Sequence, residues 1–233
     1  MNQIVLEKNK HYDEAEIINL IKQSSPTSSD THAKWVLFEM QKSKKITRIG
    51  QRRYIAGEGN RYDPDLQSII VSRITDGINR FFPLIKYVIW ETIQLNEWAN
   101  LLIAKNIIII EVESGFESII FDKLLDCFGD SYTLLFNPNE EMISRYMRDG
   151  LIVVKSLYSR SPLNRNNHKI MLEKLIVDVL AEDFLGNMLG SKGIDLLIKE
   201  IKRVYTVNES KMLTYARRRN RDMELRYYWG PIK

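Results

Sequence analysis

The sequence contains a single cysteine, Cys127, and only three histidines among its 233 residues. One cysteine cannot form an internal disulfide, and no cysteine or histidine lies near another at the spacing of metal ligands. We therefore expect Cys127 to be a small buried apolar residue and His11, His32 and His168 to be surface or capping residues. Neither a metal site nor a cofactor is predicted.

Long apolar runs are also missing. A membrane helix needs about 18 uncharged apolar residues in succession, and the stretch LLIAKNIIIIEVE is interrupted by Lys105 and Asn106. The first sixteen residues lack the basic, apolar and small segments of a signal peptide. These absences predict a cytoplasmic protein that does not contact membranes.

Two common catalytic motifs do not occur. Gly57 and Gly59 in AGEGNR are not followed by Lys-Ser/Thr, as a phosphate-binding loop would require. No G-x-S-x-G sequence is present to place a serine nucleophile on a strained turn. Enzyme chemistry that depends on either motif is therefore not predicted.

The positive charge is unevenly distributed. The formal net charge is only +4, yet seven basic residues lie between Lys34 and Arg53 against one acid, Glu39. A second cluster lies in YARRRNRDMELR and contains Arg217, Arg218, Arg219 and Arg221. Basic patches of this kind attract phosphate backbones, although a solvated surface is the alternative interpretation.

Glycine, proline and polar residues in AGEGNRYDPDLQ indicate a boundary between two domains, at residues 1–60 and 66–233. In the first, YDEAEIINLIKQ is compatible with a helix that ends at SSPTSSD. Ser28 or Ser29 is a good N-cap for a second helix over residues 30–42, in which Ala33, Leu37 and Met40 share one face. A short basic hairpin, KITRIGQRRYIAG, follows directly.

A helix, a capped helix and a basic hairpin follow one another in the order of a winged helix-turn-helix. In that architecture the second helix enters the major groove of DNA and the hairpin, or wing, contacts the backbone. Arg48, Gln51, Arg52 and Arg53 are then available for phosphates or a minor groove, and Lys45 adds charge beside them. The alternative is a solvated hairpin that closes a small protein-binding module.

Two aromatic residues do not fit the apolar face of this second helix. Trp35 and Phe38 lie opposite Ala33, Leu37 and Met40, on the face expected to meet DNA or another surface. They could instead pack on the second domain or on a second copy of the chain.

The second domain is predicted to be α/β with a helical C-terminal section from residue 166. Strands and helices that alternate along the chain favour a mostly parallel sheet covered on both faces, with residues 107–110 in its central strand. The prediction comprises four strands (residues 84–90, 106–113, 132–136 and 150–158) that alternate with three helices (residues 92–105, 116–128 and 140–148).

A weak enzyme-like pattern lies at the end of the apolar strand. Glu111 and Glu113, with Glu91 from a neighbouring strand, could hold a metal ion as in nucleases of the restriction type, although the usual lysine is missing. Carboxylates that are solvated or paired with arginine are the alternative. Glu173 and Asp178 lie on different faces of one helix, and we expect Glu173 to pair with Arg217 or Arg218.

Several segments together resemble the AbiEi-type antitoxins of bacterial type IV toxin-antitoxin and abortive-infection systems. They are Thr31 to Met40, ITRIGQRRY, YVIWETIQLNEW, IIEVESGFESIIFDKL, LLFNP, LEKLIVDVL and YTVNESKMLTYARRR. The resemblance covers nearly the whole chain. It implies a DNA-binding antitoxin and autorepressor whose partner toxin resembles a nucleotidyltransferase. It also implies that Thr31, Lys34, Arg48, Arg52 and Arg53 contact DNA and that the C-terminal domain neutralises the toxin.

Three functional hypotheses thus remain open. The first is a DNA-binding antitoxin-like autoregulator. The second is a metal-dependent nuclease or nucleic-acid-modifying enzyme that uses Glu91, Glu111 and Glu113. The third is a protein-docking module whose basic C-terminus is its electrostatic face.

Overall fold

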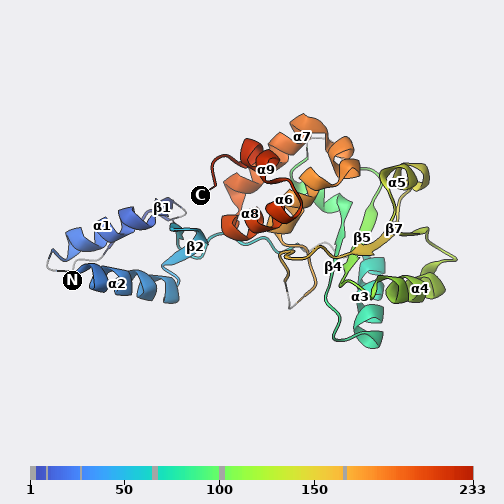
Figure 1. The fold of residues 1–233 in the computed structure, drawn as a ribbon, viewed down its shortest axis with the longest axis horizontal. Coiled ribbons are helices and arrows are strands. Elements are labelled where there is room, and N and C mark those ends of the chain that lie inside the picture. The colour runs from blue at the N-terminus through green and yellow to red at the C-terminus, as the bar shows by residue number, and fades with distance from the viewer. Residues whose placement is uncertain are drawn as a thin grey trace.

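The structure is a computed structural model that describes residues 4–8, 10–26, 28–64, 68–99, 103–164 and 167–232. It is a mixed α/β protein in which a small N-terminal part extends from a larger C-terminal part (Figure 1). The N-terminal part contains β1 (His11–Asp13), α1 (Glu14–Ser24), α2 (Asp30–Lys42), β2 (Ile46–Gly50) and β3 (Arg53–Ala56).

The N-terminal part has a core of its own. Its three strands form an antiparallel sheet in the order β1-β3-β2, and α1 and α2 bury one stripe each against it and against one another. The stripe of α2 consists of Ala33, Leu37 and Met40, as the spacing predicts. The side chain of Ser29 accepts a hydrogen bond from the backbone N–H of His32, which confirms it as the N-cap.

The C-terminal part is built on a four-stranded sheet with the order β4-β5-β7-β6. β5, β6 and β7 run parallel and β4 is antiparallel to β5, so the predicted sheet is confirmed as mostly parallel. Every residue of β5 is buried, as predicted for the central strand. The strands are β4 (Tyr87–Glu91), β5 (Ile107–Val112), β6 (Leu134–Phe136) and β7 (Leu151–Ser156).

Helices cover both faces of this sheet (Figure 1). One face packs on α3 (Ile69–Phe81) and α4 (Glu117–Phe128). The other packs on α5 (Glu140–Tyr146), α6 (Leu172–Ala181), α7 (Asp183–Val204), α8 (Glu209–Arg218) and α9 (Asp222–Trp229). Alternate residues of β5 and β7 enter the two cores, as the two-residue period of a strand requires: Ile108 and Ile110 face α3 and α4, whereas Ile107 and Ile109 face the other helices.

Besides β1, which was not predicted, two elements differ from the sequence-based expectation. α3 was not predicted, although Ile70, Val71, Ile74 and Ile78 place one buried stripe at helical spacing. The helix expected over residues 92–105 is only a short 3₁₀ helix, η1 (Thr92–Glu97), and residues 100–102 lie outside the described ranges. Neither change alters the α/β class.

The two parts meet at the linker of residues 57–64 and at α8. Asn60 accepts a hydrogen bond from the backbone N–H of Thr206, with 2.7 Å between donor and acceptor, and its side chain donates to the carbonyl of Val204 at 3.0 Å. Gly59 has a φ of +72°, and a Cβ there would lie 2.2 Å from the side-chain oxygen of Thr206. A side chain at position 59 would therefore force the linker away from the C-terminal part.

Among the described helices, none combines the length and apolar character needed to span a bilayer.

Candidate functional site

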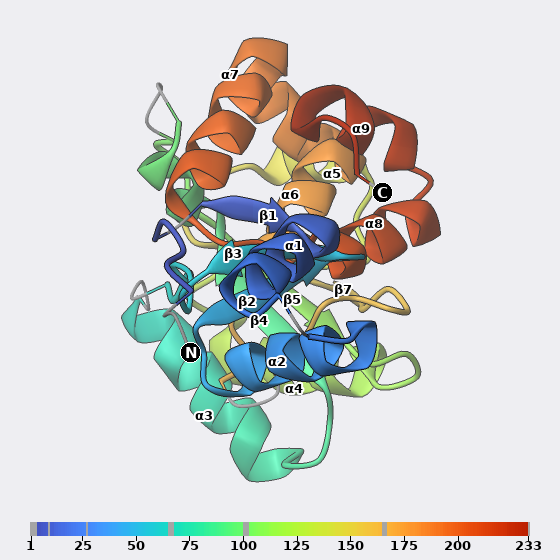
Figure 2. The same cartoon turned by 90° about the vertical axis from the view of Figure 1, so that its left-hand side faces the viewer.

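The outer face of α2 is exposed and mixed in character. Thr31, Lys34, Trp35 and Phe38 follow one another at helical spacing on the side opposite the buried stripe. The exposed fractions of Trp35 and Phe38 are 57% and 60%, which is high for side chains of this size. His32 stacks on Trp35 with 5.9 Å between ring centroids. Figure 2 shows that α2 lies on the opposite side of the molecule from α7 and α9, so this face is not covered by them.

The hairpin between β2 and β3 presents further cations. Gln51 and Arg52 form its tip and are exposed, and Arg52 adopts a φ of 56°, an uncommon value for a residue other than glycine. The carbonyl of Arg52 accepts a hydrogen bond from the backbone N–H of Glu14 at 2.8 Å, which fixes the tip against the start of α1. Arg48 and Lys45 are also exposed, and the Nε of Arg48 donates to the carbonyl of Gly50.

Arg53 departs from the expectation of a free cation on the wing. Its guanidinium forms an ion pair with the carboxylate of Glu209 in α8, 2.5 Å away, and only a quarter of its side chain is exposed. Glu209 is buried and also accepts a hydrogen bond from the indole N–H of Trp229. Arg53 therefore joins the hairpin to the C-terminal part, which sequence reasoning could not foresee because its partner lies 156 residues away.

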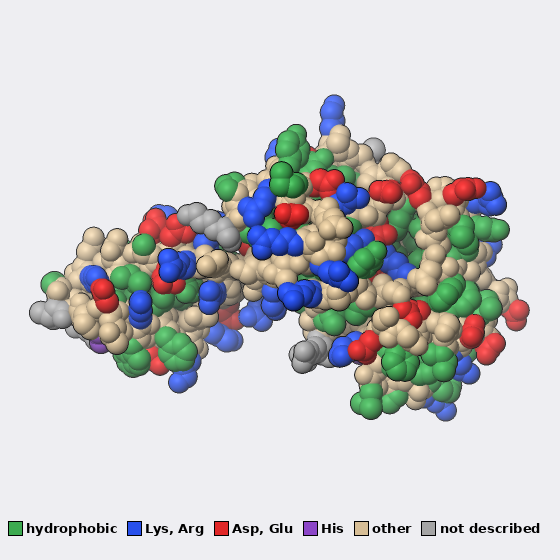
Figure 3. Space-filling view, in the orientation of Figure 1, with side chains coloured by type: hydrophobic (Ala, Val, Ile, Leu, Met, Phe, Trp, Pro, Cys, Tyr) green, Lys and Arg blue, Asp and Glu red, His purple; other side chains and the backbone are tan. Residues whose placement is uncertain are grey.

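The C-terminal basic cluster is divided between surface and interior. Arg217 and Arg218 are exposed, and Arg218 donates to the hydroxyl of Ser159. Arg219 was expected on the same surface, but its side chain is 6% exposed and forms ion pairs inside the protein. Arg221 forms an ion pair with Glu224 three residues later. Figure 3 shows that lysine and arginine side chains gather around the junction of the two parts.

A buried ionic network surrounds Lys174, which sequence reasoning did not single out. The ammonium group of this fully buried lysine contacts Glu111 at the end of β5, 2.7 Å away, and Asp178 one turn along α6. The hydroxyl of Tyr215 donates to Asp178 at 2.8 Å, and Arg219 pairs with the same carboxylate at 3.0 Å. The signal in the sequence was a lysine and an aspartate four residues apart in a largely apolar helix, since such charges need partners when buried.

The network continues to Glu182, which pairs with both Arg219 and Lys155 at 2.7 Å. Burial alone would lower the pKa of Lys174, but the carboxylates of Asp178 and Glu111 outweigh it and raise the pKa, so the ammonium stays charged. Burial would likewise raise the pKa of the Glu182 carboxyl, but Lys155 and Arg219 lower it to about 2. Opposite charges thus face one another in the network, but burial raises the pKa of the Asp178 carboxyl in spite of Lys174 and Arg219.

The three carboxylates of the nuclease hypothesis are not brought together. Glu91 lies opposite Ile108 and Glu111 opposite Val88 in the antiparallel pair, so they occupy different ends of the sheet. Glu91 accepts hydrogen bonds from the backbone of Ser68 and the side chain of Asn106, and Glu113 pairs with Lys86 at the surface. Glu111 is buried in the Lys174 network, so these residues do not form one metal site.

Three smaller expectations are corrected by the structure. Cys127 is exposed, not buried. Glu173 does not pair with Arg217 or Arg218: its carboxylate accepts a hydrogen bond from the backbone N–H of Asn208 at 2.7 Å. His168 stacks on Tyr87 with 3.9 Å between ring centroids, so it packs against the sheet. Within the described residues, no group of three or more His, Cys, Asp or Glu side chains could hold a metal ion.

Comparison with protein-family models gives one match. Residues 32–230 match the model of a family of unknown function, DUF6577. The chain belongs to the DUF6577 family. Neither the curated proteins nor the solved structures that were searched contain a match.

The DUF6577 match covers the features described above. It begins within α2 and continues through the hairpin and the linker to the end of α9. Lys34, Trp35 and Phe38 of the exposed α2 face, the Arg53–Glu209 ion pair and the Lys174 network lie inside the matched region, whereas Thr31 lies just before it.

Proposed function

We propose that this protein binds duplex DNA and regulates transcription, with the domain predicted at residues 1–60 acting as a winged helix. The observation that supports this most is that α2 and the neighbouring hairpin expose Lys34, Lys45, Arg48 and Arg52, none of which the local core needs. A helix face and a hairpin tip with cations on both are suited to a duplex, because the helix enters a groove while the hairpin follows the backbone. We further propose that the protein acts in the cytoplasm.

The two elements would perform different tasks. Arg52 and Arg48 have the charge and reach to contact phosphates, which give affinity but little sequence preference. Thr31 and Lys34 lie at the start of α2 and could donate to base edges, whereas Trp35 and Phe38 could make apolar contacts such as those with thymine methyl groups. This division of roles gives the exposed aromatic side chains a partner and separates affinity from specificity.

The biological role that we propose is an antitoxin-like autoregulator of a nucleotidyltransferase-type toxin. It is supported by the sequence resemblance to AbiEi-type antitoxins, and the C-terminal part would neutralise the toxin with or without direct contact. Co-expression is the test: if a nucleotidyltransferase-type toxin is encoded beside this chain, the full chain should restore growth to cells that produce that toxin. Growth arrest that the full chain does not relieve would contradict the antitoxin role but not DNA binding.

DNA binding itself is tested by fluorescence anisotropy with a labelled duplex from upstream of the gene. The logarithm of affinity should fall linearly with the logarithm of salt between about 50 and 200 mM, with a slope near −0.9 for each phosphate contact. Arg52→Ala should weaken binding to all sequences and reduce the slope by about one contact. Lys34→Ala should weaken binding to the operator more than to unrelated DNA.

The matched control is Lys199→Ala, which removes an exposed cation from α7, far from the proposed interface. It should bind DNA as the wild type does. If Arg52→Ala and Lys34→Ala both bind with wild-type affinity and salt slope, the proposed interface is wrong.

A further inference from the structure

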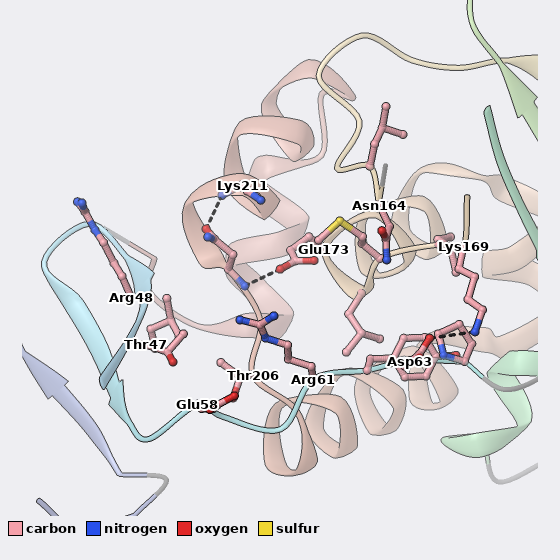
Figure 4. A pocket seen from close by; sticks show the side chains of 18 residues that line it. Thr47, Arg48, Glu58, Arg61, Asp63, Asn164, Lys169, Glu173, Thr206 and Lys211 are labelled. Carbon is pink, nitrogen blue, oxygen red and sulfur yellow. Dashed lines mark hydrogen bonds and ion pairs between the residues drawn. The ribbon is translucent and has the colours of Figure 1, made fainter. Parts of the chain in front are cut away.

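A cleft separates the hairpin from the C-terminal part. It has a volume of about 570 Å³ and is lined by β2, the linker, the loop before α6 and the start of α8 (Figure 4). Pockets of about 300 to 1,000 Å³ are typical of small-molecule sites. No residue in the cleft was singled out from the sequence except Arg48 and Glu173, so the cleft became visible only through the fold.

The acidic side chains of the cleft already have partners. Glu58 pairs with Lys44 and Asp63 with Lys169. Glu173 is buried and accepts the backbone N–H of Asn208. Their negative charge is therefore largely engaged in contacts within the protein.

The cationic side chains are less fully engaged. Arg61 and Lys211 are exposed, and neither side chain has a hydrogen bond or ion pair to another residue in the ranges that the structure describes. Arg61 projects from the linker toward Glu173, and Lys211 lies on α8 (Figure 4). The guanidinium of Arg48 lies at the outer rim and points away from Arg61. Two unpaired cations thus approach one cleft from two segments that are 150 residues apart.

Neutral groups complete the wall. Thr206 and Asn208 supply a hydroxyl and an amide, although the amide oxygen of Asn208 already accepts from the backbone of Lys211. Tyr62 forms an aromatic side of the cleft and packs edge-on against Tyr205, with 5.4 Å between ring centroids. Cations, a hydroxyl and an aromatic surface are the groups that bind phosphorylated molecules.

We propose that Arg61 and Lys211 form a phosphate-binding site in this cleft. The phosphate could belong to a free nucleotide or to the backbone of bound DNA. In either case the ligand would contact the linker and α8 together and would hold the N-terminal part against the C-terminal part, beside the Arg53–Glu209 ion pair. A free nucleotide would then act as an effector of the proposed regulator, whereas a backbone phosphate would extend its DNA interface.

Two binding measurements on the full chain distinguish the sources. Isothermal titration calorimetry with ATP and with inorganic phosphate tests the free ligand, and anisotropy with an unrelated duplex tests the backbone. The variant is Arg61→Gln with Lys211→Gln, and its control is Lys199→Gln with Arg203→Gln, two exposed cations of α7. The conservative pair Arg61→Lys with Lys211→Arg retains the charge.

If the source is a free nucleotide, wild type and control bind ATP, the charge-free variant binds it at least about tenfold more weakly, and the conservative pair retains most of the affinity. If the source is the DNA backbone, ATP does not bind, and the charge-free variant lowers duplex affinity with a salt slope reduced by about two contacts. The proposal is overturned if the variant matches the control in both measurements.

This inference extends the proposed function but can fail separately from it. A wild-type chain that binds no DNA but binds ATP through Arg61 and Lys211 would end the DNA-binding proposal and keep the phosphate site. If the chain binds DNA through α2 and Arg52, and replacing Arg61 and Lys211 changes neither measurement, the DNA-binding proposal stands and the phosphate site is rejected.

Discussion

Replacing Lys174 by methionine tests the buried ionic network. Methionine has a similar volume and no charge, so the change removes the ammonium group without opening a large cavity. Glu111 then loses its 2.7 Å ion pair, and its second carboxylate oxygen is buried without a hydrogen-bond partner among the described residues. Asp178 keeps Tyr215 and Arg219.

The magnitude follows from the charge left behind. Removing one partner of a buried ion pair costs about 3–5 kcal/mol, because the remaining charge is uncompensated. We expect Lys174→Met to lower the free energy of unfolding by that amount, and in a part of this size each 1 kcal/mol corresponds to a decrease in Tm of about 2–4 °C. Glu111 bears most of the loss, so adding Glu111→Gln to Lys174→Met should recover part of the stability.

Urea unfolding monitored by circular dichroism measures these changes. The control is Lys199→Met, since Lys199 and Asp195 form an exposed pair at the same four-residue separation. Exposed helical pairs contribute about 0.3–0.5 kcal/mol, so the control should barely change the midpoint. If Lys174→Met is as stable as Lys199→Met, Lys174 does not stabilise the protein through its buried ion pairs. The same conclusion follows if adding Glu111→Gln lowers the stability of Lys174→Met further.

Three further predictions concern other contacts. Arg53→Met should destabilise the chain by about 1–3 kcal/mol in urea unfolding, because it leaves the buried Glu209 carboxylate without its cation. Arg53→Met combined with Glu209→Gln should cost less stability than Arg53→Met alone, and equal losses would refute the pairing. The pKa of Glu182 is lowered from 4.5 to about 2, so its contribution to stability is present above pH 4.5 and is lost as the pH falls toward 2. Glu182→Gln should therefore be less stable than wild type at pH 7 and lose less stability between pH 4.5 and 2, and parallel pH profiles would contradict this. Cys127 should react with a thiol reagent in the native protein because it is exposed, whereas reaction only in denaturant would show it to be buried.

Periodicity in the sequence was sufficient to predict most of the fold. The continuous apolar run of residues 107–110 indicated a central strand, and β5 does lie between β4 and β7. The spacing of Ala33, Leu37 and Met40 correctly identified the buried face of α2. These predictions succeed because local pattern decides which face of an element must be buried. The antiparallel direction of β4 depends on how the chain crosses the sheet, which no local pattern contains.

The charged sites were harder to predict because charges choose partners across the fold. Arg53 and Arg52 are neighbours in the sequence, yet one pairs with Glu209 in α8 and the other is exposed at the hairpin tip. Arg219 similarly enters the interior while Arg217 and Arg218 stay outside. A cluster of basic residues therefore predicts a charged surface, but not which of its members are free to bind a ligand.

Oxidative footprinting with and without duplex DNA tests the central proposal, that α2 meets DNA, most directly. Hydroxyl radicals modify exposed aromatic and methionine side chains, and mass spectrometry locates the products. Trp35 and Phe38 are exposed, and Met223 and Tyr227 on α9 provide exposed references away from the interface. We predict that saturating DNA reduces oxidation of Trp35 and Phe38 severalfold and leaves Met223 and Tyr227 unchanged. Equal oxidation of Trp35 and Phe38 in the free and the DNA-saturated protein would contradict the proposal.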